Sequence, residues 1–250
     1  MTEQNTQQQR QFKILLIGDN CTDVYQYGTV DRLSPEAPVP VFVPTHKEER
    51  EGMAGNVYAN LVALGCKVDL VCGISSKKTR LIDSRSKQQI LRLDEDIKSV
   101  PVANVDPTSY DAVVISDYNK GVVSYELIES LFRYTVPVFI DTKKTDLERM
   151  QGAWVKINEL EYSKVKSECT GLIVTRGDKG AEAMHQGVSV HAPKVEVVDV
   201  TGAGDTFLSA LAYEWLKTKD IKQSMMFATK AASITVQHMG CYAPTLKEIE

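Results

Sequence analysis

Short apolar runs and longer amphipathic stretches alternate along most of this chain. The apolar runs predict buried strands at residues 12–17, 68–71, 112–115, 136–140, 154–157 and 172–174. The amphipathic stretches predict helices at residues 55–64, 124–132, 159–165, 204–217 and 221–238. This alternation predicts an α/β fold with a mainly parallel central sheet, and such sheets bind ligands at the carboxyl ends of their strands.

Two regions interrupt the alternation, residues 24–43, which contain Pro35, Pro38 and Pro40, and residues 78–93. We expect them to form a small antiparallel sheet that stands off the main one as a β lid. The exposed face of such a sheet must be covered by substrate, by a second subunit, or by both. We therefore predict a single domain over residues 12–250, a homodimer formed through the lid, and a disordered polar tail at residues 1–11.

The segment from Asp199 to Thr206 carries the strongest chemical signal in the chain. It reads Asp-Val-Thr-Gly-Ala-Gly-Asp-Thr, and it joins a predicted strand at residues 195–198 to a predicted helix. At a helix N-terminus, the unpaired amides of Gly202, Ala203 and Gly204 and the helix dipole can hold an anion. The missing side chains would let a phosphate approach closely, so the turn is predicted to bind phosphate.

Asp205 directly follows this turn. Taken alone, it could simply cap the helix, with the glycines only making a turn. The combination of two glycines and an adjacent acid favours a phosphoryl-transfer site. The helix dipole predicts a lowered pKa for Asp205, which suits a reaction that needs mainly orientation and charge stabilisation.

Further polar motifs follow predicted strands. Asp19 and Asp23 could accept hydrogen bonds from sugar hydroxyls, or Asp19 could only form a turn. Asn158 and Glu161 could act on a ligand, or cap a helix. Residues 175–180 form a glycine-containing loop whose alternative is a hairpin turn; it offers phosphates the backbone at Gly177 and the cations Arg176 and Lys179.

Together these motifs resemble the ribokinase-like carbohydrate kinase family, whose fold is a three-layer sandwich around a mainly parallel sheet. The resemblance implies that Asp205 takes the proton from a sugar hydroxyl, that the turn amides stabilise the transferring phosphate, and that Asp23 binds the sugar. Residues 52–56 match the family's Gly-Gly-x-x-Asn element at Gly52 and Asn56. Met53 stands where the second glycine would be, which makes the substrate contacts there differ.

The same resemblance implies ATP and Mg²⁺ as cofactors. Asn158 and Glu161 match the family's Asn-x-x-Glu motif, which acts on Mg²⁺ and phosphate largely through water. The loop with Thr175 and Gly180 resembles the nucleotide loop, and Lys230 occupies the position beside the adenine where relatives usually carry Asn. The sequence does not decide whether a potassium ion binds near residues 199–201.

A narrower resemblance rests on residues 32–41, which read Arg-Leu-Ser-Pro-Glu-Ala-Pro-Val-Pro-Val. This phrase is similar to that of D-glycero-β-D-manno-heptose 7-phosphate kinases, and residues 78–80, 89–94, 116–121 and 141–143 echo the same branch. A phosphorylated acceptor needs cations, and the candidates, with Asn119 beside them, are Arg32, Lys78, Arg80, Arg92, Lys120 and Lys143. Several of these could merely solvate the lid, and we expect about half of them to touch ligand.

Two differences from that branch bear on function. Only residues 74–76 lie between Gly73 and Lys77, where the family inserts a segment of roughly one βα unit. The chain also ends at Glu250 without the nucleotidylyltransferase domain of bifunctional relatives, so we expect phosphorylation only. The alternatives are a kinase for another sugar or sugar phosphate, and a catalytically weak protein that binds nucleotide or sugar in a regulatory role.

Composition adds limits to these expectations. The net charge of −4 on 250 residues gives no general attraction to nucleic acid, and the partners that the resemblance implies are ATP and a sugar phosphate. The five cysteines form no Cys-x-x-Cys pair, which fits a reduced cytoplasmic protein. No apolar run approaches the length needed to span a membrane.

Overall fold

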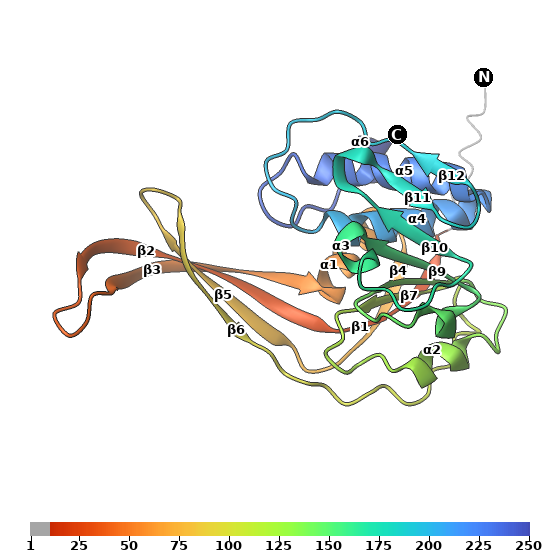
Figure 1. Cartoon of the computed structure of the whole chain (residues 1–250), viewed down its shortest axis with the longest axis horizontal. Coiled ribbons are helices and arrows are strands. Elements are labelled where there is room, and N and C mark those ends of the chain that lie inside the picture. Colours follow the sequence, from red (N-terminus) through yellow and green to blue (C-terminus); the bar gives the residue numbers. More distant parts are fainter. Residues whose placement is uncertain (1–10) are drawn as a thin grey trace, which may run out of the picture.

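The central sheet has eight strands and is parallel across most of its width (Figure 1). The computed structural model describes residues 11–250, so the predicted tail lies outside them apart from Gln11. The parallel strands, in spatial order, are β4 (Lys67–Cys72), β1 (Lys13–Gly18), β7 (Ala112–Asp117), β8 (Val138–Thr142), β9 (Ala153–Asn158) and β10 (Leu172–Thr175). Strands β11 (Ala181–Ala183) and β12 (Val188–Val190) add an antiparallel edge. The predicted α/β fold with a mainly parallel sheet is confirmed.

Helices cover both faces of this sheet. Ile14 and Leu16 of β1 pack into one core with α1 (Ala54–Ala63), α4 (Ala203–Thr218) and α5 (Ile221–Thr235). Leu15 and Ile17 pack into a second core with α2 (Tyr125–Leu131) on the other face. Successive residues of a strand point to opposite faces, so a central strand must be apolar throughout. The remaining short helices are η1 (Leu147–Met150), α3 (Glu159–Tyr162), η2 (Gly177–Lys179) and α6 (Leu246–Ile249).

The lid is a second sheet of four strands that projects from the body as a long arm (Figure 1). Its strands are β2 (Asn20–Leu33), β3 (Pro40–Met53), β5 (Ser76–Asp83) and β6 (Gln89–Glu95). Two antiparallel hairpins, β2–β3 and β5–β6, are joined along a parallel pairing of β2 with β5. The lid therefore extends beyond the predicted segments at residues 24–43 and 78–93, and its central pair is parallel.

The predicted strand at residues 195–198 is wrong. These residues form an irregular segment, and the amides of Val198 and Asp199 both donate to the carbonyl of Val236 at the end of α5. Val195 and Val197, two of the three valines that suggested a strand, line a cavity instead of pairing with β12. Within residues 11–250, no helix combines the length and the apolar character that crossing a membrane requires.

Candidate active site

A cavity of about 510 Å³ lies where the β10–β11 turn faces the start of α4. Thr175, Gly177 and Gly180 line it from the turn, and Ala203 and Gly204 line it from the helix N-terminus. These residues come from the predicted nucleotide loop and the predicted phosphate turn. The fold therefore brings two motifs that are separate in the sequence to one cavity.

Asp205 occupies the first turn of α4 and is only 5% exposed. Its Oδ2 accepts a hydrogen bond of 2.7 Å from Nδ2 of Asn56, which lies on α1. Its Oδ1 lies 3.4 Å from the hydroxyl of Tyr118, which follows β7. Three elements thus converge on one carboxylate, and Asn56 contacts it as well as lying in the predicted sugar-binding motif.

The pKa of Asp205 is raised from 3.8 to about 6, chiefly because burial disfavours the charged carboxylate. The nearby carboxylate of Asp141 raises the pKa further, whereas the Asn56 hydrogen bond, Lys156 and Tyr118 lower it. The lowered pKa that the helix dipole suggested is therefore wrong, since desolvation outweighs the dipole. A carboxylate with this pKa is ionised at pH 7.5 and is a better base than an exposed one.

The glycines of the turn make room for the side chains around Asp205. Gly202 has a φ of 80°, and a Cβ there would lie 2.7 Å from Nδ2 of Asn56. A Cβ on Gly204 would lie 2.6 Å from Nζ of Lys156. Real Cβ atoms essentially never come that close to other atoms, so neither position accepts a larger residue without displacing these groups. Close approach of a phosphate, which the sequence suggested, is therefore not the only reason for glycine.

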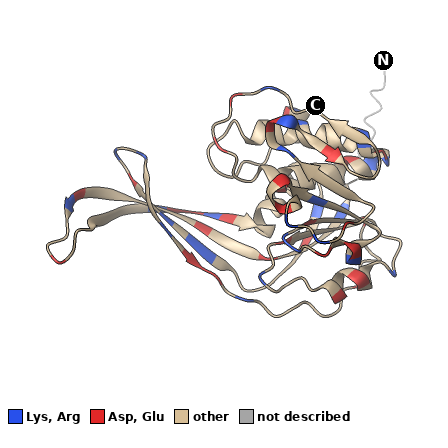
Figure 2. Cartoon of the chain, viewed as in Figure 1, with Lys and Arg blue, Asp and Glu red and all other residues tan. Residues whose placement is uncertain are grey.

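The body-proximal half of the lid carries basic residues on one face. Asp23 of β2 forms an ion pair with Arg80 of β5, and Lys78 pairs in register with Asp23. Arg92 of β6 lies opposite Arg80, and Arg50 of β3 lies opposite Asp23. Figure 2 shows charges of both signs along these strands. The predicted residues Asp23, Lys78 and Arg92 thus share one face of the sheet, together with Arg50, which the sequence reasoning missed.

Gly52 lies against the carboxylate of Asp23. A Cβ on Gly52 would sit 2.3 Å from Oδ2 of Asp23. The glycine of this motif is therefore required by the packing of Asp23 within the lid. The next residue, Met53, is buried and has a φ of 51°, which is strained for a residue with a side chain.

Tyr118 links the lid to the body of the site. The ammonium groups of Lys78 and Lys143 both lie near its ring, with Nζ atoms 5.8 and 5.1 Å from the ring centroid. The pKa of Tyr118 is raised well above 10, first by the charge of Asp205 and then by burial, so its hydroxyl stays protonated. Tyr118 therefore acts as a hydrogen-bond donor toward Asp205.

Asp19 positions this loop and does not face the cavity, which corrects its predicted role in substrate binding. Its carboxylate is 1% exposed and accepts hydrogen bonds from the amides of Tyr118, Lys120 and Val122. Asn119, in the same loop, has a φ of 58°, and its side-chain oxygen accepts from Lys144. Asp19 is thus a scaffold for the residues that do face the site.

Asn158 and Glu161 form a capping box at the start of α3. The side chain of each accepts a hydrogen bond of 2.8 Å from the backbone amide of the other. The second carboxylate oxygen of Glu161 is bound by Lys143. Both oxygens of Glu161 are thus engaged, and no cluster of three potential ligands occurs in residues 11–250. This donor set fits Mg²⁺ that is held through water molecules better than Mg²⁺ that is coordinated directly by these side chains.

Several predicted cations lie away from the cavity. Arg176 is paired with Glu159 and Glu182, at 3.0 Å each, and Lys179 is exposed on η2. Lys120 pairs with Asp96. Arg32 lies near the tip of the lid, about 30 Å from Asp23 along β2 at the usual rise per residue. Within one subunit, Arg32 does not reach Asp205.

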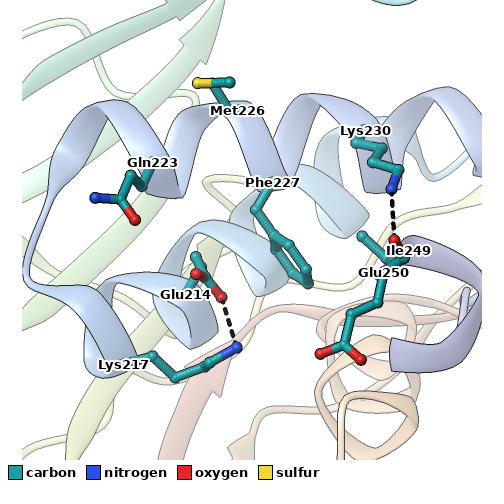
Figure 3. A pocket seen from close by; sticks show the side chains of 8 residues that line it. All are labelled: Glu214, Lys217, Gln223, Met226, Phe227, Lys230, Ile249 and Glu250. Carbon is teal, nitrogen blue, oxygen red and sulfur yellow. Dashed lines mark hydrogen bonds and ion pairs between the residues drawn. The ribbon is translucent and has the colours of Figure 1, made fainter.

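Lys230 is also placed elsewhere, which corrects its predicted contact with the nucleotide. Figure 3 shows it in a separate pocket of about 400 Å³, where its Nζ lies 3.2 Å from the carbonyl oxygen of Glu250. The face of α5 that lines the nucleotide cavity instead carries Thr229, Ala232, Ser233 and Val236. Lys230 lies one residue round the helix from this face, so its side chain points toward α6.

Sequence reasoning overlooked Tyr118, Asp141 and Lys156 as parts of the site. Tyr118 and Asp141 lie in the motifs at residues 116–121 and 141–143, in which only Asn119, Lys120 and Lys143 were predicted to bind substrate. Lys156 is a charged residue inside an otherwise apolar predicted strand, and a buried charge of this kind is a usable signal because it requires a partner.

Comparison with known proteins agrees with this geometry. Residues 144–248, which include Asn158, the nucleotide loop and Asp205, match the family described as pfkB family carbohydrate kinase. A protein from Nitratiruptor sp. named "Bifunctional protein HldE" is 36% identical over an alignment covering 95% of this chain. A protein of the same name from Haemophilus influenzae is 33% identical over 96% of this chain.

The chain spans just under two thirds of these relatives, 64% and 63% of their lengths. Each alignment extends over 301 positions, so at least 51 of them have no residue in this chain of 250. Among solved structures, Arabidopsis thaliana ribokinase complexed with ribose and ATP superposes with a TM-score of 0.74 at 17% identity, covering 96% of this chain and 98% of that one. Phosphofructokinase-2 from Escherichia coli in complex with potassium gives 0.72 at 14% identity, with 95% and 97% covered. These similarities confirm the predicted ribokinase-like fold.

The crowding at Gly202 predicts an unequal effect of two similar substitutions. Gly187→Ala introduces a side chain at a φ of 63° with no atom within 4 Å, so it should cost only backbone strain, about 1–2 kcal/mol. Gly202→Ala adds a collision with Asn56 and should cost about 3 kcal/mol or more. Urea unfolding of both variants measures the difference, and equal losses would contradict the crowding.

The raised pKa of Asp205 predicts that removing its charge stabilises the protein at neutral pH. The folded-state pKa lies above the ordinary value, so ionisation of Asp205 lowers the free energy of unfolding. This loss of stability is absent below about pH 3.8 and complete above about pH 6. Asp205→Asn should raise the free energy of unfolding by up to about 3 kcal/mol at pH 7.5 and by about half as much at pH 5. Urea unfolding at both pH values tests this, with the exposed Asp178→Asn as a control that should change neither value. A variant less stable than the wild type at both would refute the assignment.

Proposed function

We propose that this chain is a carbohydrate kinase of the pfkB family and that it transfers the γ-phosphate of ATP to O1 of D-glycero-β-D-manno-heptose 7-phosphate, giving the 1,7-bisphosphate. The observation that carries the proposal is the buried Asp205, with a pKa of about 6, next to the turn that lines the cavity. A base of matched pKa beside an anion-binding helix N-terminus is what transfer of a phosphoryl group to a hydroxyl requires.

In this proposal the nucleotide lies in the cavity between the β10–β11 turn and α5. Val197, Ala232 and Val236 line that cavity and provide apolar walls for a base. The amides of residues 202–204 receive the transferring phosphoryl group. Bound Mg²⁺ supplies charge neutralisation of the nucleotide phosphates, and Asn158 and Glu161 would hold it through water.

The acceptor is placed beneath the lid, with its hydroxyl at Asp205. Asp205 orients this hydroxyl and takes its proton, while Asn56 keeps the carboxylate in position. The phosphate carried by the acceptor is assigned to the basic face of the lid, where Lys78, Arg80 and Arg92 lie near Asp23. The heptose itself is inferred from the sequence phrase at residues 32–41.

A kinase for another sugar phosphate is the second candidate. Met53 is buried and strained at the position where the family motif has glycine, and the link between β4 and β5 is only residues 73–75. Both features alter the wall that an acceptor would contact. They leave the phosphoryl-transfer centre unchanged.

The lid also supports a homodimer. Its outer half exposes Leu33, Val39 and Val43, which are 65%, 51% and 52% exposed. Apolar side chains gathered at the end of a projecting sheet favour a partner surface. A dimer in which each lid covers the other subunit would also bring Arg32 to a substrate, which a single subunit does not do.

Replacement of Asp205 tests the reaction directly. Asp205→Asn should lower kcat by at least about 10³-fold, because the base is lost, while the Kd for ATP changes little. Assays of ADP release should use heptose 7-phosphate beside other sugars and sugar phosphates, with ATP binding measured by calorimetry. Near-normal turnover in the variant would refute the role of Asp205, and turnover of another acceptor alone would select the second candidate. ATP binding without turnover of any acceptor would instead indicate a binding protein.

Substitution on the lid tests the dimer. Leu33→Asp combined with Val43→Asp should convert a dimer to a monomer, because it places charges in the proposed interface. Analytical ultracentrifugation measures the mass, and Met226→Asp on α5, at a residue 56% exposed, is the matched control. A wild-type monomer, or a dimer that survives the double substitution, would rule out this interface.

A further inference from the structure

A buried ion pair lies directly beneath the phosphate turn. Lys156 of β9 and Asp141 of β8 are register partners in the parallel sheet, and Nζ of Lys156 lies 2.7 Å from Oδ2 of Asp141. The two residues are 3% and 5% exposed. The position that a Cβ of Gly204 would take is 2.6 Å from this Nζ, so the ammonium contacts the turn from the side of the sheet.

This pair is not arranged to maximise stability. Both side chains are buried, and burying charges costs free energy unless every polar atom is satisfied. Oδ1 of Asp141 has no hydrogen-bond partner among residues 11–250. Asp117 offers a contrast, because its buried carboxylate is bound by Lys144, by the Thr142 hydroxyl and by the Asn119 amide.

Both charges of the pair act on Asp205, in opposite directions. The Lys156 ammonium favours the ionised carboxylate of Asp205, and the Asp141 carboxylate disfavours it. The two charges of the pair therefore offset each other at Asp205. The other groups that face or influence Asp205 come from β2, α1, the loop after β7, the end of β8 and the C-terminal segment, and they are Cys21, Asn56, Tyr118, Lys143 and Cys241.

We propose that Asp141 and Lys156 are positioning residues of the phosphoryl-transfer centre, acting as one unit beneath Gly204. Lys156 adds positive charge to the turn where the phosphoryl group arrives, and Asp141 offsets that charge so that Asp205 still accepts a proton. The inference deepens the proposed function, because it rests on Asp205 as the base. It predicts opposing effects of the two residues on Asp205, together with an effect of Lys156 on kcat that a merely structural ion pair would not have.

Titration of Asp205 in the ligand-free protein tests this without an acceptor. Aspartate labelled with ¹³C at the carboxyl carbon is followed by NMR against pH, and the Asp205 signal is the one absent from Asp205→Asn. Asp141→Asn should move the midpoint of Asp205 to lower pH by about one unit or more, since only the ammonium then faces it. Lys156→Met should move it to higher pH by a similar amount, because two carboxylates then face each other.

Lys144→Met is the matched control. It removes a buried ammonium that lies 2.9 Å from Asp117 and pairs with that carboxylate, not with Asp141, so the midpoint should stay close to its wild-type value. Midpoints that move in the same direction in Asp141→Asn and Lys156→Met, or that do not move, would overturn the proposal. If a single variant does not fold, the double variant decides: removing both charges should shift the midpoint by less than about one unit, and a larger shift counts against paired action.

Activity separates this inference from the proposed function. Where turnover is measurable, kcat/KM against pH should show its acidic limb displaced in the same opposite directions, and Lys156→Met should lower kcat more than it raises KM for ATP. Opposite NMR shifts without any turnover would retain the inference about the pair and refute the kinase. Turnover with unchanged midpoints would retain the kinase and refute the pair.

Discussion

Desolvation of one carboxylate is the constraint on which the rest of the site depends. In the proposed reaction Asp205 must be buried to become an effective base, and it must remain ionised near neutral pH. Asn56 and the Asp141–Lys156 pair meet these opposing demands from two different elements, α1 and the sheet. Both groups need space next to the first turn of α4. That need explains the glycines at positions 202 and 204, because a side chain at either would displace one of them.

The proposed acceptor-binding surface differs from this centre in that its charges are partly exposed to solvent. Its charges lie on the lid, a sheet that projects from the body and has much of its surface in solvent (Figure 2). Pairs such as Arg92 with Asp94 are partly exposed and therefore hold their side chains weakly. Exposed basic groups can exchange an acidic partner for a phosphate at little cost. The proposed phosphoryl-transfer centre is thus buried, whereas the proposed acceptor surface is partly exposed and can change its ion pairs.

Much of the fold could be predicted because its central strands are apolar on both faces, which is a property of the local sequence. The strand predicted at residues 195–198 does not form, because Val195 and Val197 line a cavity, and hydrophobicity alone does not distinguish a strand from a cavity wall. Asp205 was found because its motif is contiguous. Its pKa was misjudged because burial depends on α1 and the sheet, which no local pattern reveals.

Partners that meet only through strand register were the hardest to foresee. Lys156 and Asp141 lie fifteen positions apart, and their contact depends on the alignment of β8 with β9. Arg50 reaches the basic face of the lid only because β3 pairs with β2 opposite Asp23. For Lys230 the position in the sequence matched the family pattern, but its place on the helix directs the side chain toward α6.

The lid strands lead without a linker into residues that hold the base. Strand β3 ends at Met53, α1 begins at the next residue, and Asn56 lies within its first turn. The lid and Asn56 are therefore connected by one continuous segment, and the strained residue Met53 is the junction between them. Rotation of the arm over an acceptor would turn α1 and change how Asn56 meets Asp205. If the lid closes over an acceptor, that movement and the orientation of the proposed base would therefore be coupled through Met53 and α1.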